Sequence, residues 1–307
     1  MRFKKVFASV GLVAAAALAL TGCNSGTPGA TDGGTDTDTG NGGDTSSALW
    51  EVAEGFALDG SPTFEKIQER GKVVIGVKED QPGLGYLDNV TGERSGFDVD
   101  IARWIAASIG FDEDQIEYKA IASANREQAI MNDDIDYYVG TYSITDKRKA
   151  DIDFAGPYFV TGQGLLIRQG DTDYQSLVEL EGFTVCSATG STPIQNIKEN
   201  FPGIKTQEFD LYSACVENLV NNQVDAVTTD QAILIGYAAQ DPENLMVTSG
   251  PLLTEELYGI GLTKGDDTLR AHINDLFTGG GSIWQGIFDK NLGDSGIVIA
   301  QPAVDAY

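Results

Sequence analysis

The feature that most constrains the fold is a regular alternation of two hydrophobic patterns between residues 72 and 291. Short apolar runs such as Lys72–Val77 end in loops rich in Gly and Pro, which is typical of buried β-strands. The next segment, Phe97–Ile109, instead carries an apolar residue at every fourth position, on one face of a helix. Strands that alternate with helices in this way predict α/β layers around largely parallel sheets.

The same two patterns recur as far as Asn291. Further strands are predicted at Gln115–Ile121, Tyr137–Tyr142, Gly164–Arg168, Phe183–Ser187, Asp225–Thr229, Leu245–Thr248 and Gly259–Thr263. Helices are predicted at Arg126–Asn132, Thr192–Asn200, Tyr212–Asn222, Gln231–Ala239, Thr268–Phe277 and Ser282–Asn291. The sequence contains no internal repeat, no P-loop and no GxGxxG motif.

The balance of charge sets aside several classes of function. The chain has 20 Lys and Arg against 46 Asp and Glu, a formal net charge of −26. Nucleic acids and acidic membrane faces are bound through basic surfaces, so neither is an expected partner of this surface. One His and three Cys leave little for a His-based catalytic triad or a zinc cluster, so no metal is expected.

The N-terminus has the pattern of a targeting segment. Basic residues at positions 2, 4 and 5 precede an apolar run that is short for a membrane span, so residues 1–22 are predicted to be a secretory signal. Leu20–Cys23 resembles the lipobox of bacterial lipoproteins, in which the Cys is lipidated and the chain is cut before it. Residues 24–48 are mostly Gly, Thr, Ser and Asp with no aromatic residue, a composition that does not fold.

We therefore expect residues 23–48 to be a lipidated Cys23 followed by a flexible tether. This predicts an extracytoplasmic protein that a lipid holds on the outer face of the cell membrane. A plain signal peptide with an incidental Cys is the alternative. After export two cysteines are left, Cys186 and Cys215, and an even pair in an oxidising compartment usually forms a disulfide. Two free buried thiols are the other possibility.

One stretch is specific enough to identify a family. It resembles the signature of the receptors of polar amino-acid ABC importers, the bacterial extracellular solute-binding proteins of family 3. The residues that carry the resemblance are Thr141–Arg148, Ile152–Phe154, Pro157–Tyr158, Gly96–Asp100, Thr189–Thr192 and Val224–Ala226, in a chain segment from about Thr63 to Asn291. The surroundings of Cys186 and Cys215 are similar to those in actinobacterial glutamate-binding lipoproteins.

The resemblance implies an α/β fold of the type II periplasmic-binding-protein class, with two lobes, a ligand cleft and a two-strand hinge. It implies that residues 64–157 plus 257–307 form lobe 1, and that residues 162–250 form lobe 2. It also implies a monomer that needs no cofactor and delivers an amino acid to the permease subunits of an ABC importer, which work with a cytoplasmic ATPase.

The roles of individual residues follow from the same resemblance. Arg148 would bind the α-carboxylate of the ligand, because a guanidinium group matches a carboxylate with two hydrogen bonds. Asp230 would bind the α-ammonium group. Further ligand contacts are implied at Thr141, Ser143, Gly190, Thr192 and Thr229.

Two more cations indicate what kind of side chain is bound. Lys78 ends the first strand, and Arg126 follows Asn125 as in receptors for acidic amino acids. Both favour glutamate, with aspartate, glutamine and asparagine as lesser ligands; the alternative is that both are solvated surface charges. Two other functions stay open: a dehydratase-like enzyme that uses Glu79 or Asp80 as its acid, and a ligand-sensing domain for a signalling partner.

Overall fold

The computed structural model of the chain describes residues 49–171 and 174–307. The predicted signal peptide, the lipidation site at Cys23 and the tether lie outside the described residues. Within the described part, no helix is both long enough and apolar enough to cross a membrane.

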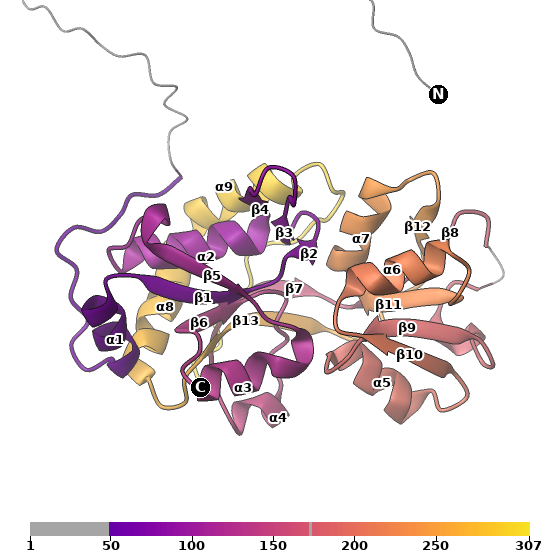
Figure 1. Ribbon diagram of the computed structural model, residues 1–307, viewed down its shortest axis with the longest axis horizontal. Helices are drawn as coiled ribbons and strands as arrows, with labels where there is room; N and C mark the ends of the chain where they lie inside the picture. The colour runs from indigo at the N-terminus through magenta and orange to yellow at the C-terminus, as the bar shows by residue number, and fades with distance from the viewer. Residues whose placement is uncertain (1–48, 172–173) are drawn as a thin grey trace, which may run out of the picture. The chain divides into compact units, whose positions relative to one another are not determined.

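The first of two five-stranded sheets joins two distant parts of the chain (Figure 1). Its order is β5 (Ile116–Ala120), β1 (Val73–Val77), β6 (Tyr137–Val139), β13 (Glu256–Leu262) and β7 (Asp153–Thr161). Strand β1 is parallel to β5 and β6, whereas β13 is antiparallel to β6 and β7. Its helices are α1 (Pro62–Arg70), α2 (Phe97–Ser108), α3 (Arg126–Met131), α4 (Asp146–Lys149), α8 (Asp267–Gly279) and α9 (Gly281–Leu292). We call this part lobe 1.

The second sheet repeats this plan with a continuous stretch of chain. Its order is β10 (Lys205–Phe209), β9 (Thr184–Ala188), β11 (Ala226–Asp230), β8 (Gln163–Arg168) and β12 (Leu245–Val247). Strand β9 is parallel to β10 and β11, and β8 is antiparallel to β11 and β12. Its helices are α5 (Thr192–Asn200), α6 (Tyr212–Val220) and α7 (Gln231–Gln240). This part is lobe 2, and its disulfide joins Cys186 in β9 to Cys215 in α6, with the Cα atoms 5.5 Å apart.

The helices expected from the sequence agree with the observed ones to within two residues at each end. The expectation of largely parallel sheets is wrong for half of the strand pairs. The reason is that β13 and β8 enter their sheets directly from the crossing between the lobes, opposite in direction to the parallel strands. The sequence pattern also missed β10, whose residues are polar and partly exposed at the sheet edge, and the long strand β7.

A third, small sheet also escaped prediction. It consists of β2 (Asp80–Gln81), β3 (Gly85–Leu87) and β4 (Arg94–Ser95), which are too short to show a periodic pattern. Strands β3 and β4 pack on α2, so this sheet belongs to lobe 1, while β2 reaches α6 and α7 of lobe 2.

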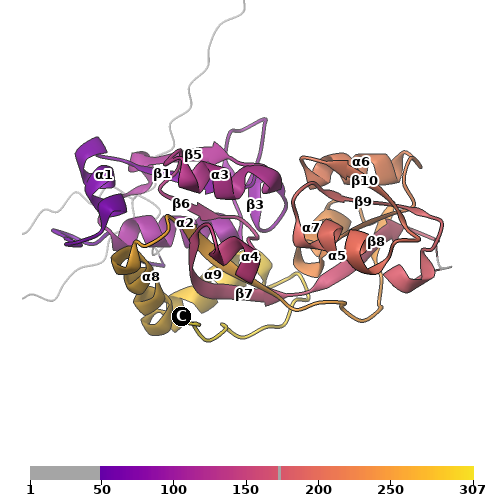
Figure 2. The ribbon, with the colours of Figure 1, turned by 90° about the horizontal axis from the view of Figure 1, so that it is seen from below.

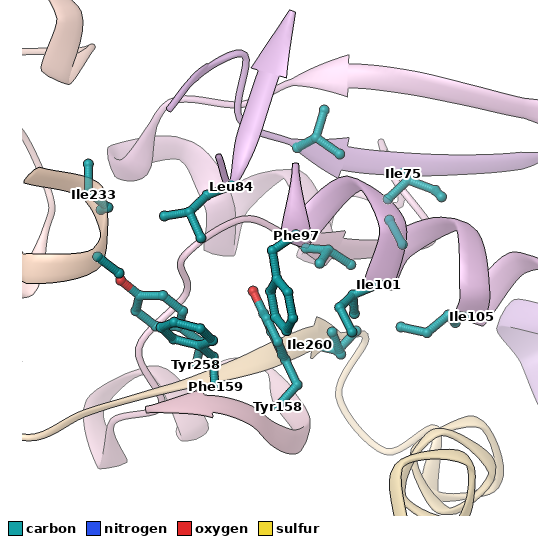
Figure 3. Close-up of a cluster of buried hydrophobic side chains, with 14 of the residues drawn as sticks. Ile75, Leu84, Phe97, Ile101, Ile105, Tyr158, Phe159, Ile233, Tyr258 and Ile260 are labelled. Atoms are coloured by element: carbon teal, nitrogen blue, oxygen red, sulfur yellow. The ribbon is translucent and has the colours of Figure 1, made fainter. Parts of the chain in front are cut away.

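The chain crosses between the lobes twice, from β7 into β8 and from β12 back into β13 (Figures 1 and 2). Strands β7 and β13 are paired from Asp153↔Leu262 to Thr161↔Glu256, with a register shift between Tyr258 and Ile260. Side chains of this pair, among them Phe159 and Tyr258, belong to a cluster of buried hydrophobic side chains (Figure 3). In it the rings of Phe159 and Tyr258 are stacked 5.5 Å apart, which fixes the direction of the Tyr258 hydroxyl toward lobe 2.

Candidate ligand-binding site

A small cavity, with about 10 Å³ of space for the centre of a water-sized sphere, lies where the two lobes meet. Five of the nine predicted ligand residues line it, together with Ser123, Ser191 and Tyr212. These five are Arg126, Thr141, Ser143, Thr192 and Asp230. They come from four different segments of the chain, so only the folded molecule brings them together.

Asp230 is the last residue of β11 and is almost completely buried. Its Oδ2 accepts a hydrogen bond of 2.7 Å from the Tyr258 hydroxyl. Its Oδ1 is buried without a hydrogen-bond partner among the described residues. Burial, and then the neighbouring carboxylate of Glu256, raise the pKa of Asp230 to about 7. A buried carboxylate oxygen without a hydrogen-bond partner costs free energy. A ligand that donates a hydrogen bond to it from a positively charged group would remove that cost.

Arg126 begins helix α3 and lines the same cavity. Its Nε donates to the carbonyl of Ser123 at 3.1 Å, and its Nη1 donates to the carbonyl of Thr141 at 3.3 Å. Its guanidinium carbon lies 4.2 Å from the centre of the Tyr142 ring. These partners leave donors of the guanidinium group free for an anion, because it has five N–H groups.

Lys78 directly follows β1 and is also buried. Its Nζ donates to the Ser123 hydroxyl at 2.8 Å. Burial, and then the positive charge of Arg126, lower the pKa of Lys78 to about 7. Lys78 does not line the small cavity but an adjoining pocket whose far wall includes Leu211 and Ser213 of lobe 2. The ion pairs of the described residues include neither Lys78 nor Arg126.

Arg148 lies on the opposite side of the cavity, in the short helix α4. It joins the lobes, because Nη1 donates to the Ser143 carbonyl at 2.6 Å and Nη2 to the Gly190 carbonyl at 3.2 Å. Its acidic partner is Glu127 at 3.0 Å. Burial, and then the charge of Arg126, lower the pKa of Arg148 from its ordinary value. Arg148 and Gly190 line a pocket next to the small cavity rather than the cavity itself.

Two of the remaining predicted residues have special backbone positions. Gly190 has a φ of +76°, and a Cβ there would lie 2.6 Å from the Cα of Ala124 in lobe 1. Only glycine therefore permits this contact between the lobes. Thr141 has a φ of 47° and donates its N–H to buried Asp98 at 3.0 Å. Thr229 is fully buried in β11, and the lining of the small cavity does not include it.

Sequence reasoning missed the residues that hold these groups in place. Glu256 accepts hydrogen bonds from Thr192 at 3.1 Å and from Thr254 at 3.0 Å, and its charge acts on Asp230. Asp98 accepts from Thr141 and, at 2.9 Å, from the Tyr158 hydroxyl, and burial raises its pKa to about 6. The motif Gly96–Asp100 was a signal for Asp98, but nothing local marks Glu256, which is 26 residues from Asp230.

Comparison with known proteins settles the family. The model of the "Bacterial extracellular solute-binding proteins, family 3" matches residues 73–279. The chain belongs to this family. It is 42% identical over 246 residues to the glutamate-binding protein GluB of Corynebacterium efficiens, covering 76% of this chain and 83% of that protein. It is 41% identical over 206 residues to the glutamine-binding protein of Geobacillus stearothermophilus, covering 67% of this chain and 78% of that protein.

Solved structures of this class share the fold. An ancestral arginine-binding protein bound to glutamine has a TM-score of 0.66 and 30% identity, and the match covers 73% of this chain and 99% of that one. The L-cysteine receptor of Neisseria gonorrhoeae has a TM-score of 0.71 and 25% identity, and covers 80% of this chain and 99% of that one. The chain therefore has the two-lobed type II fold and is an extracytoplasmic amino-acid receptor of the ABC importers, not an enzyme.

Proposed function

We propose that this family member binds glutamate between its two lobes and delivers it to an ABC importer. The observation that carries the proposal is the buried Oδ1 of Asp230, which has no hydrogen-bond partner among the described residues; Asp230 and Arg126 line the same small cavity. A carboxylate and a guanidinium group on the walls of one cavity match a ligand that has both an ammonium and a carboxylate group. Asp230 would bind the α-ammonium group, whose positive charge favours the ionised carboxylate.

Arg148 would bind the α-carboxylate, helped by Thr141, Ser143, Gly190, Thr192 and Thr229. Its guanidinium group already lies between the Ser143 and Gly190 carbonyls, one from each lobe. A carboxylate that accepts from the remaining N–H groups of Arg148 in lobe 1 and from backbone N–H groups at Gly190 or Thr192 in lobe 2 would be held by both lobes at once. This favours the closed form of the protein when ligand is bound.

Three buried cations support an acidic ligand. Lys78, Arg126 and Arg148 are buried around the cleft, and burial, followed by the charge of Arg126, lowers the pKa of Lys78. Glutamate carries a second carboxylate that would relieve this repulsion, whereas glutamine and asparagine carry a neutral amide. Aspartate has the charge but a shorter reach. We therefore expect glutamate as the preferred ligand and the other three as weaker ones.

The proposal extends to where the receptor works. Residues 1–22 would be removed, Cys23 lipidated, and residues 23–48 would tether a monomeric receptor to the outer face of the membrane. Residues 64–157 plus 257–307 and residues 162–250 would move as two lobes about β7 and β13. Closure would present a surface to the permease subunits, and no cofactor would be needed.

Calorimetric titration of the protein with glutamate, glutamine, aspartate, asparagine and arginine tests the ligand assignment. We expect glutamate to bind most tightly and Asp230→Asn to weaken every ligand. Asp225→Asn is the matched control, because Asp225 accepts from the Thr184 N–H inside lobe 2. A preference for glutamine or arginine would overturn the glutamate assignment. Binding of all five ligands unchanged by Asp230→Asn would overturn the proposed site.

The anchor is tested by Cys23→Ala. We expect the variant to leave the membrane fraction while its affinity for glutamate stays the same, because the tether takes no part in the cleft. Membrane fractionation with immunodetection measures the first effect, and calorimetry measures the second. Retention of a correctly exported variant on the membrane would show that the anchor lies elsewhere.

A further inference from the structure

A second set of contacts joins the lobes outside the cavity, at the tip of lobe 1. Asp80 of β2 accepts a hydrogen bond of 3.1 Å from the Ser213 N–H of α6 through its Oδ2. The Tyr237 hydroxyl of α7 donates to the same Oδ2 at 3.2 Å and to the Asp80 carbonyl. Neither Asp80 nor Tyr237 lines the small cavity, but both line the adjoining pocket together with Ser213 and Lys78. We call these three residues the clasp.

The clasp completes a helix of the other lobe. Helix α6 begins after Leu211, whose side chain has no oxygen, and its N-cap position makes no side-chain hydrogen bond. The first N–H groups of a helix have no partner within the helix, and an aspartate is among the best side chains to accept from them. Its negative charge is also favoured at the positive end of the helix dipole. Here that aspartate comes from a position 133 residues earlier, in the opposite lobe.

The backbones of the two lobes touch beside the clasp. A Cβ at Gly236 of α7 would lie 2.2 Å from the carbonyl oxygen of Pro82, which follows β2. Only a residue without a side chain lets α7 approach the turn this closely. Tyr237 is the next residue, so the close approach at Gly236 is what brings its hydroxyl within reach of Asp80.

We propose that Asp80 is a positioning residue that holds the closed receptor shut and thereby sets how slowly the ligand leaves. Asp80 and Pro82 belong to lobe 1, whereas Ser213, Gly236 and Tyr237 belong to lobe 2. Separation of the lobes breaks every contact of the clasp. Because the clasp contacts join the two lobes whichever amino acid is bound, they stabilise the closed complex of every ligand. This inference rests on the proposed function only in requiring that an amino acid is bound by closure.

Stopped-flow kinetics on the full chain, with glutamate and with glutamine, test the inference. A helix cap contributes about 1–2 kcal/mol, which corresponds to about a 5- to 30-fold change in an equilibrium constant. We expect Asp80→Ala to raise the dissociation rate of both ligands by this factor and to change association little. Asp80→Asn should restore most of the loss, because its amide oxygen still accepts from the Ser213 N–H. Gly236→Ala should also speed dissociation, since its methyl group meets the Pro82 carbonyl.

Matched controls separate the clasp from general damage. Gly279→Ala adds a methyl group where nothing lies within 4 Å. Tyr174→Phe is the control for Tyr237→Phe, because it removes a hydroxyl that donates to the Asp225 carbonyl inside lobe 2. Both controls should release ligand at the wild-type rate. The melting temperature of the ligand-free Asp80→Ala protein should match that of the wild type, while that of its complex falls.

Three results would overturn the inference. Unchanged dissociation from Asp80→Ala and Gly236→Ala would show that the clasp does not hold the bound form. An effect on one ligand alone would make Asp80 a ligand contact. An equal fall in the melting temperatures of the free protein and the complex would make it a support of the fold. If the wild-type protein binds no amino acid, the proposed function is overturned as well. If the wild-type protein binds and the variants release ligand at the same rate, only the role of the clasp is overturned.

Discussion

The two lobes share one arrangement of strands but place opposite charges at the cleft. Each sheet has three parallel strands at one side and antiparallel strands at the other. In lobe 1 the carboxyl end of the parallel strand β1 leads to Lys78, whereas in lobe 2 the carboxyl end of the parallel strand β11 is Asp230. Open α/β sheets bind ligands at the carboxyl ends of their strands. The same arrangement of strands, present in both lobes, therefore supplies a positive and a negative side chain for a dipolar ligand.

The lobes also differ in how they are held together. The largest buried cluster extends through both lobes; its part in lobe 1 holds the aromatic residues around Phe97 and Tyr158, and all three Trp residues, at positions 50, 104 and 284, belong to lobe 1. Its part in lobe 2 includes the disulfide, and lobe 2 also contains a smaller, mostly aliphatic cluster. The covalent link therefore lies in the lobe with less aromatic core. The predictions below use these two contrasts.

The largest expected effect is that of Arg148→Ala. All amino acids share the α-carboxylate, so every ligand should lose affinity. Removing one partner of a desolvated charge pair costs on the order of 2–5 kcal/mol, which is about 30- to several thousand-fold in the dissociation constant. Calorimetry with glutamate and glutamine measures this. Lys147→Ala, an exposed neighbour, is the control, and a loss confined to glutamate would assign Arg148 to the distal carboxylate instead.

Loss of the disulfide should act on lobe 2 alone. A cross-link that closes a loop of this length stabilises a fold by about 3–4 kcal/mol in the chain-entropy model. In the double variant Cys186→Ser with Cys215→Ser, we expect unfolding by urea to begin in lobe 2. Because the three Trp lie in lobe 1, circular dichroism should then change before Trp fluorescence. Coincident transitions of the variant at the wild-type midpoint would contradict this. So would full alkylation of Cys186 and Cys215 in the wild-type protein before reduction.

Charge removal on lobe 1 should change selectivity more than affinity as a whole. Lys78→Met or Arg126→Gln should weaken glutamate by about 10- to 150-fold, as expected for a hydrogen bond to a charged group worth about 1.5–3 kcal/mol. Glutamine should be weakened much less, because the shared contacts cancel in the affinity ratio. Lys66→Met removes an exposed cation of lobe 1 and serves as the control. Equal losses for both ligands would mean that these cations only support the cleft.

The smallest effect is a difference in pH dependence. The pKa of Lys78 in the free cleft is about 7, and a bound carboxylate would raise it, so glutamate binding above about pH 7 must take up a proton. Glutamate affinity should therefore fall as pH rises from 7, by up to about tenfold per pH unit, while glutamine affinity should not. Calorimetry in buffers of different ionisation enthalpy counts the protons.

Asp230 should produce the opposite pH dependence of affinity, and for both ligands. Its pKa of about 7 would be lowered by a bound ammonium group, so binding below about pH 7 must release a proton. Both affinities should fall together as the pH decreases, and the ratio of glutamate to glutamine affinity should change on the alkaline side alone. A ratio that is constant from about pH 6 to about pH 8.5 would show that Lys78 does not meet the distal carboxylate.

The sequence by itself determined what depends on neighbours along the chain. The periodicity of Phe97–Ile109 and of Thr192–Asn200 was enough to place α2 and α5, because one buried face repeats within a single element. The motif around Thr141–Arg148 was enough for the family. The pairing of Cys186 with Cys215 was predicted by counting, because the expected lipidation of Cys23 would leave no other free cysteine, and the structure confirms it.

The tertiary structure alone decided how these pieces meet. Strand β10 is polar and owes its place to pairing with β9, and β8 and β13 run antiparallel because the chain crosses between the lobes. Three contacts join residues that are far apart in sequence or on facing elements. These are the contact of Glu256 with Thr192, that of Glu127 with Arg148, and that of Asp80 with α6. A local hydrophobic pattern records which face of an element is buried. It does not indicate which distant polar group that face will contact, and the binding site consists of such contacts.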